Sequence, residues 1–168
     1  MDRIRLYHFS PFAYLILTAC GGGGGSSSQN LQFGGNIIKG PLSNATVFVD
    51  YDGDGILDSG EPSTTTDSNG AFTLTSTSST AQIGATTDAN TIDTSTGQSL
   101  AGVILKAPAG SKVVTPVTTL IQETGMTSTE VADALGLTGV DLLNFNPFAA
   151  GADAATALKV EKVGQQII

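Results

Sequence analysis

Five carboxylates lie within the twelve residues 50–61, DYDGDGILDSGE, and their spacing is the feature of the sequence that could do chemistry. They are Asp50, Asp52, Asp54, Asp58 and Glu61. Carboxylates placed this close repel one another, and each repulsion raises the cost of keeping them ionised. A cation among them turns that repulsion into attraction. The stretch therefore predicts a metal-binding loop built from oxygen ligands.

The stretch fits the pattern D-x-[DN]-x-[DN]-G-x5-E, the calcium loop of an EF-hand, at every defined position. Gly55 at the sixth position permits a sharp turn, and the seventh residue is expected to bind through its backbone carbonyl. The expected ligands are Asp50, Asp52, Asp54, Ile56, Asp58 and Glu61. Calcium is preferred over magnesium because magnesium takes fewer protein ligands in stricter geometry. The alternative is a solvated acidic turn, which a complete match disfavours.

The residues on either side of the loop indicate strands, whereas an EF-hand has helices there. Residues 45–50, ATVFVD, alternate between two faces and are rich in β-branched types, and Pro62 with three threonines follows the loop. Further short strands are expected at residues 36–42, 64–66, 71–75 and 101–107, separated by turn residues. This pattern predicts a mainly β fold, a small β-sandwich over residues 35–112 with the calcium loop between two of its strands.

A short helical segment is expected to follow, over residues 113–168. Residues 115–125 begin with a Thr-Pro start signal and end at a glycine, and residues 127–136 carry the spacing of a capping box. Residues 146–168 continue with apolar side chains at helical spacing. The sequence stops at Ile168 without a helix-stop signal, so this segment is expected to be truncated.

The first residues have the layout of an export signal. Residues 1–19 combine an arginine-containing start with an apolar stretch, as a secretory signal peptide does. The stretch LTAC resembles a bacterial lipobox, which implies cleavage before Cys20 and a lipid on that cysteine. The Gly/Ser-rich residues 20–34 are expected to form a flexible tether. Because Gly21 follows the cysteine where inner-membrane lipoproteins carry aspartate, the resemblance implies a lipid anchor in the outer membrane of a bacterial cell envelope.

Composition excludes several classes of function for the processed chain. The single histidine, His8, lies in the predicted leader, and Cys20 is the single cysteine, so neither a Ser-His-Asp or Cys-His centre nor a His/Cys zinc site is expected. A net charge of −8 argues against nucleic acid as a partner. A glycosidase using paired carboxylates stays as an alternative, which is disfavoured because the acidic residues gather in one glycine-rich loop. The protein is therefore not expected to be an enzyme.

Residues 39–74, KGPLSNATVFVDYDGDGILDSGEPSTTTDSNGAFTL, resemble the calcium-loop region of the prealbumin-like B-type repeats of bacterial surface proteins. The resemblance covers about a fifth of the chain and implies a β-sandwich that calcium stiffens. It implies a lipid-anchored surface module with a structural or adhesive role, whose partners are a surface protein or a glycan. Tyr51 beside the loop could serve a calcium-assisted glycan site or could cover the metal. Asp67 could cap its own turn or approach the metal.

Overall fold

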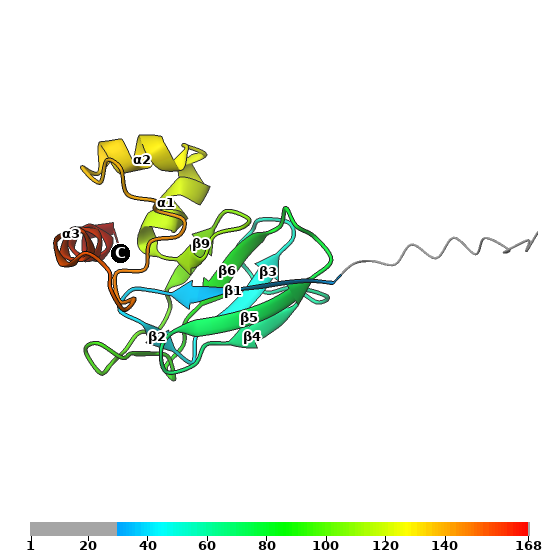
Figure 1. Cartoon of the computed structure of the whole chain (residues 1–168). Helices are drawn as coiled ribbons and strands as arrows, with labels where there is room; N and C mark the ends of the chain where they lie inside the picture. Colours follow the sequence, from blue (N-terminus) through cyan, green and yellow to red (C-terminus); the bar gives the residue numbers. More distant parts are fainter. Residues whose placement is uncertain (1–29, 168) are drawn as a thin grey trace, which may run out of the picture.

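The computed structural model of the chain describes residues 30–167, so the predicted leader and Cys20, the predicted site of lipid attachment, lie outside the described part. The fold is mainly β, as predicted, and three helices follow the last strand (Figure 1). The strands are β1 (Leu31–Ile37), β2 (Leu42–Ser43), β3 (Thr46–Asp50), β4 (Ser63–Thr65), β5 (Ala71–Ser76), β6 (Gln82–Thr86), β7 (Ile92–Asp93), β8 (Gln98–Ser99), β9 (Ile104–Ala107) and β10 (Val113–Val114). The helices are α1 (Pro116–Thr124), α2 (Ser128–Ala134) and α3 (Ala154–Ile167).

The strands form three sheets with the orders β10-β1-β5, β2-β7-β8 and β4-β3-β6-β9. All pairs are antiparallel except β1 with β10, which run parallel. The sheets β10-β1-β5 and β4-β3-β6-β9 contribute most of the buried side chains of one apolar cluster, as the two layers of a sandwich do, and Leu42 of β2 adds to it. Its members are Ile37, Leu42, Ala45, Val47, Val49, Phe72, Leu74, Ile83, Ala85, Leu105, Ala107 and Val114.

Strand β3 is buried on both faces and leads directly into the acidic loop. Val47 and Val49 point into the cluster between the sheets. Phe48 points to the opposite face and is also completely buried. Its cross-strand partner on β6 is Gly84, where a Cβ atom would overlap the phenyl ring. Asp50 lies on the same face as Phe48, so the loop begins on this outer face of the four-stranded sheet.

Several predicted boundaries need correction. Strand β1 begins at Leu31 and pairs with β5 from its first residue, so the tether ends before residue 34. Strand β10 extends the β region past residue 112, because Val113 pairs with Asn36 of β1. Strand β6 was not predicted, although it lies between β3 and β9 in the four-stranded sheet. Its sequence QIGAT has a central glycine, which weakens the strand pattern. The glycine is required because a Cβ atom at Gly84 would overlap the ring of Phe48.

The caps of α1 and α2 confirm the predicted helix starts. Thr115 accepts a hydrogen bond from the backbone N–H of Thr118 at 3.0 Å, and Thr127 forms a capping box with Glu130. The third helix begins at Ala154, later than the predicted residue 146, because the residues before it form turns. Its first turn is capped by the Asp153 carboxylate, which accepts the N–H of Thr156 at 2.9 Å.

The helices gather at one end of the β region and share a second apolar cluster (Figure 1). The buried residues of that cluster are Val117, Ile121, Val131, Ala132, Leu137, Leu142 and Val160. Within residues 30–167, no helix has both the length and the apolar character needed to cross a bilayer.

Helix α1 also covers the open edge of β9, where the hydroxyl of Thr118 donates to the carbonyl of Lys106 at 2.8 Å. Covering an edge strand in this way blocks unwanted strand pairing.

Candidate metal site

The acidic loop joins β3 to β4 and lies across the outer face of the four-stranded sheet. Gly53 and Gly55 have φ values of 86° and 81°, a region that favours glycine. A Cβ atom at Gly53 would overlap the Gln82 side chain on β6, and one at Gly55 would overlap the Lys106 side chain on β9. Glycine is therefore favoured at both positions by the backbone turn, and a Cβ atom at either would also displace the end of a flexible side chain on the sheet.

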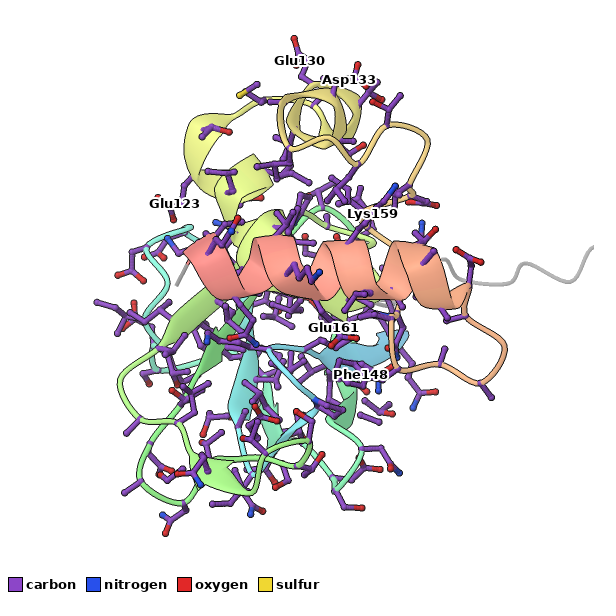
Figure 2. All side chains as sticks on the ribbon, turned by 90° about the vertical axis from the view of Figure 1, so that its left-hand side faces the viewer. Glu123, Glu130, Asp133, Phe148, Lys159 and Glu161 are labelled. Atoms are coloured by element: carbon purple, nitrogen blue, oxygen red, sulfur yellow. The ribbon has the colours of Figure 1, made fainter. Side chains whose placement is uncertain are left out.

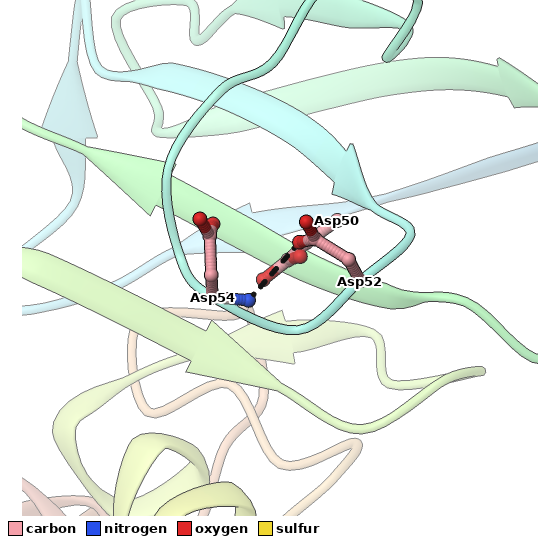
Figure 3. Close-up of side chains that lie close together, drawn as sticks. All are labelled: Asp50, Asp52 and Asp54. Carbon is pink, nitrogen blue, oxygen red and sulfur yellow. Dashed lines mark hydrogen bonds between the residues drawn. The ribbon is translucent and has the colours of Figure 1, made fainter.

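Asp50, Asp52 and Asp54 converge at the start of this loop (Figure 3). One carboxylate oxygen from each lies within 4.8 Å of the other two, so the group could hold a metal ion. Asp50 is 1% exposed, whereas Asp52 and Asp54 are exposed. The geometry therefore combines one carboxylate fixed inside the fold with two that face solvent, which leaves an open side for an incoming cation.

Backbone N–H groups orient all three carboxylates. Asp50 accepts from Gly53 at 2.6 Å through one oxygen and from Gly55 at 3.0 Å through the other. Asp52 accepts the N–H of Asp54 at 3.2 Å, the bond drawn in Figure 3, and Asp54 accepts the N–H of Ile56 at 2.7 Å. A carboxylate oxygen with one such bond keeps a further lone pair for a cation. The loop thus orients these three carboxylates through main-chain hydrogen bonds.

Glu61 joins the two ends of the loop. Its Oε1 accepts the N–H of Tyr51 at 2.7 Å, and its Oε2 accepts the N–H of Asp58 at 2.9 Å. Asp58 is exposed, and the side chain of Ile56 is 58% exposed, as expected if only its carbonyl is used. The structure thus brings three of the predicted ligands together in a group that could hold a metal ion, and the ligand roles of all six residues stay predictions.

The electrostatics of the loop reflect its crowding. Burial raises the pKa of Asp50, the two glycine N–H bonds oppose that rise, and the charges of Glu61 and Asp52 add to it. The pKa of Asp58 is also raised, by desolvation and then by the charges of Asp54, Asp52 and Glu61. A carboxyl group with a raised pKa is ionised at a cost, and a bound cation removes that cost.

These pKa shifts predict opposite pH dependences with and without a metal ion. A raised pKa means that the folded state holds its proton more tightly than the unfolded state, whose reference value for aspartate is 3.8. In metal-free buffer, the Asp50 contribution to the free energy of unfolding should therefore be present at low pH. It should be lost as the pH rises from about 4 through the raised pKa. With calcium, protons compete with the ion, so stability should increase with pH over the same range.

Urea unfolding at several pH values in metal-stripped and calcium-containing buffers measures both slopes. Glu130 and Asp153 in the helical region have pKa values lowered by hydrogen bonds, so they add a pH dependence of the opposite sign. The difference between wild type and Asp50→Asn removes these contributions and leaves that of Asp50. Slopes of the same sign in the two buffers would contradict the prediction.

Two residues that contact the loop were not predicted, because they are distant in sequence. Gln82 lies opposite Asp50 in the β3–β6 register, and its buried Oε1 has no hydrogen-bond partner among the described residues. Lys106 donates to the carbonyl of Gly53 at 3.3 Å. No local motif marks either residue. The alternation of β6 and β9 could have placed them on the outer face only if the strand pairing had been known.

The structure shows the contacts of Asp67 and Tyr51, and the two roles proposed for Tyr51 stay predictions. Asp67 caps its own turn by accepting the N–H groups of Asn69 at 2.8 Å and Ala71 at 2.9 Å, and it is not part of the carboxylate group. Tyr51 is 44% exposed, and its hydroxyl lies 3.1 Å from that of Ser76. Hydrogen bonds from Ser76 and Thr77 lower the pKa of Tyr51.

Comparison of the chain with protein-family models, with curated proteins and with solved structures gave no match. The resemblance of residues 39–74 to B-type surface repeats therefore stays a prediction. The functional interpretation rests on the geometry of the loop and on the sequence signals at the N-terminus.

Proposed function

We propose that the protein is a calcium-binding structural module, held at a bacterial surface by a lipid on Cys20. The observation that carries the proposal is the convergence of Asp50, Asp52 and Asp54, whose oxygens lie within 4.8 Å of one another and are oriented by backbone N–H groups. Carboxylates at alternate positions of a glycine-containing turn form a ligand set for a hard cation. In a solvated turn without a cation, the same carboxylates would repel one another, and their convergence would not stabilise the loop.

Calcium fits this ligand set better than other common metals. All the candidate side-chain donors are oxygens, which favours calcium, magnesium or manganese over zinc or copper. The candidate ligands number six when the carbonyl of Ile56 is included, and calcium takes about six to eight oxygens. Magnesium keeps several of its waters and demands near-octahedral geometry, so a loop rich in protein ligands suits it less.

The proposed effect of calcium is to stiffen the β region. The loop contacts both inner and edge strands of the four-stranded sheet, through Gln82 on β6 and Lys106 on β9. An ion that binds only the folded state adds to stability in proportion to the logarithm of its concentration. With a single cysteine the chain cannot form an intramolecular disulfide, so an ion can supply the cross-link that small extracellular domains often need.

The surface role is inferred from residues 1–34, which combine an export signal, the LTAC stretch and a Gly/Ser-rich segment. A lipid on Cys20 would anchor the chain, and the flexible segment would separate the β region from the membrane. The role is proposed to be non-catalytic, because the carboxylates of the loop are arranged as ligands. Their hydrogen-bond partners are backbone N–H groups, which orient the carboxylates within one loop as a shared cation would require.

Terbium luminescence tests calcium binding at this loop. Terbium(III) is a calcium-like ion that emits when a nearby tyrosine transfers energy to it, and Tyr51 directly follows the first ligand. We expect emission from the full chain in detergent on tyrosine excitation, stoichiometric displacement by calcium, and loss of emission in both Tyr51→Phe and Asp52→Ala. Calcium should still bind the Tyr51→Phe variant by calorimetry, because that change removes only the donor. Emission that persists in Asp52→Ala, or that calcium does not displace, would contradict the proposed site.

A further inference from the structure

Lys106 on β9 is the cation that contacts the acidic loop. Its Nζ donates to the carbonyl of Gly53 at 3.3 Å and lies 2.8 Å from the Glu123 carboxylate at the end of α1. The Lys106 side chain is 12% exposed, whereas that of Glu123 is 55% exposed. The ammonium group thus lies between the loop and the helix, with its aliphatic chain beneath Gly55.

The backbone of Lys106 is also bound to α1. Its N–H donates to the hydroxyl of Thr119 at 2.9 Å, and its carbonyl accepts from the hydroxyl of Thr118 at 2.8 Å. One residue therefore carries hydrogen bonds to the helix from its main chain and to the loop from its side chain. The edge of the sheet, the helix and the loop meet at this point.

The energetics indicate a positioning role. A pair whose carboxylate is more than half exposed contributes little to global stability, because solvent screens it. The pair nevertheless fixes where the ammonium group lies, and Glu123 offsets the positive charge that would otherwise repel a cation in the loop. Removing Lys106 should cost the loop its support from α1, and this loss opposes the electrostatic gain that a bound cation has when a nearby positive charge is removed.

We propose that Lys106 couples metal binding in the acidic loop to the packing of helix α1. The inference rests on the proposed metal-binding function and adds a positioning residue to it. An ion that orders residues 50–55 holds the Gly53 carbonyl in place, which strengthens its bond to Lys106 and the contact of Lys106 with Glu123. Coupling of this kind is reciprocal, so loss of the link must weaken metal binding by the same factor by which it removes the effect on the helix.

Amide hydrogen exchange measured by NMR on the full chain in detergent tests the coupling, with calcium as the probe. In the wild type, saturating calcium should slow exchange of the amides at residues 119–125 by about fivefold. In Lys106→Met, which keeps the unbranched side chain beneath Gly55, calcium should no longer slow them. The dissociation constant for calcium should rise as well, by up to about fivefold, because the loss of a nearby positive charge opposes the loss of the link. Lys159→Met, at an exposed position on α3, is the matched control and should behave as wild type (Figure 2).

Glu123→Gln provides the second arm. If the pair acts as one link, the double variant Lys106→Met with Glu123→Gln should bind calcium no more weakly than Lys106→Met alone. Additive losses in the double variant would overturn the link through Glu123. Calcium binding by the wild type without slower exchange in α1 would overturn the coupling alone. A wild type that binds no calcium would overturn the proposed function together with the coupling.

Discussion

Calcium at a hundred times its dissociation constant is expected to raise the melting temperature of the protein by about 8 to 10 °C. An ion that binds only the folded state stabilises it by about 2.7 kcal/mol at that excess. One kcal/mol shifts the melting temperature by about 4 to 8 °C in domains of about 60 to 100 residues and by about 2 to 4 °C in larger ones. Residues 30–167 fall between these sizes. The gain is a large share of a total stability of about 5 to 15 kcal/mol.

Differential scanning calorimetry in calcium and in metal-stripped buffer measures this shift. The Asp52→Ala variant should melt at the same temperature in both buffers, because the loss of a ligand removes calcium binding. Asp52 is exposed, so the substitution should change the metal-free melting temperature little. Magnesium at the same concentration should produce a smaller shift in the wild type. Equal melting temperatures of the wild type in the two buffers would show that the ion does not stabilise the fold.

The second large effect is expected from Asp50→Asn, which should weaken calcium binding by about a hundredfold. Calcium affinity in such loops spans several orders of magnitude and depends on the number of charged ligands and the rigidity of the site. Asp50 contributes to both, because it is buried and accepts the N–H groups of Gly53 and Gly55. Asparagine has one acceptor oxygen, so it loses the charge and one of the two bonds that shape the turn.

Asp67→Asn is the matched control for this variant. Asp67 also accepts two backbone N–H bonds, but in the turn between β4 and β5 and outside the carboxylate group. Isothermal titration calorimetry should find wild-type affinity in Asp67→Asn. If both variants bound calcium equally well, or equally poorly, the affinity would not depend on the position of Asp50 in the loop.

The features that could be predicted from the sequence are those encoded by neighbouring residues. The spacing of Asp50, Asp52 and Asp54 around glycines encodes a turn in which backbone N–H groups meet carboxylates, and the structure has that turn. The starts of α1 and α2 were predicted because a cap is a local hydrogen bond. Thr127 and Glu130 form their capping box within one turn of helix. The mainly β fold followed from short alternating stretches bounded by turn residues.

The features that could not be predicted depend on pairing between distant residues. Strand β6 has a weak strand pattern in the sequence because it has a glycine, Gly84, where the ring of Phe48 leaves no room for a side chain. That contact exists only after β3 and β6 have paired. Lys106 reads in the sequence as a charged residue on a strand, yet its main chain contacts α1 and its side chain contacts the loop. The tether was predicted to extend to residue 34, but the backbone of residues 31–34 pairs with β5.

A crystal structure in millimolar calcium, with anomalous diffraction data, tests the central claim most directly. The claim predicts an anomalous peak among the carboxylates of Asp50, Asp52 and Asp54, with oxygens at about 2.3 to 2.6 Å and six to eight of them in total. Asp58, Glu61 and the carbonyl of Ile56 should complete the set. A loop without a peak, whose Asp52 and Asp54 side chains point into solvent at that calcium concentration, would contradict it.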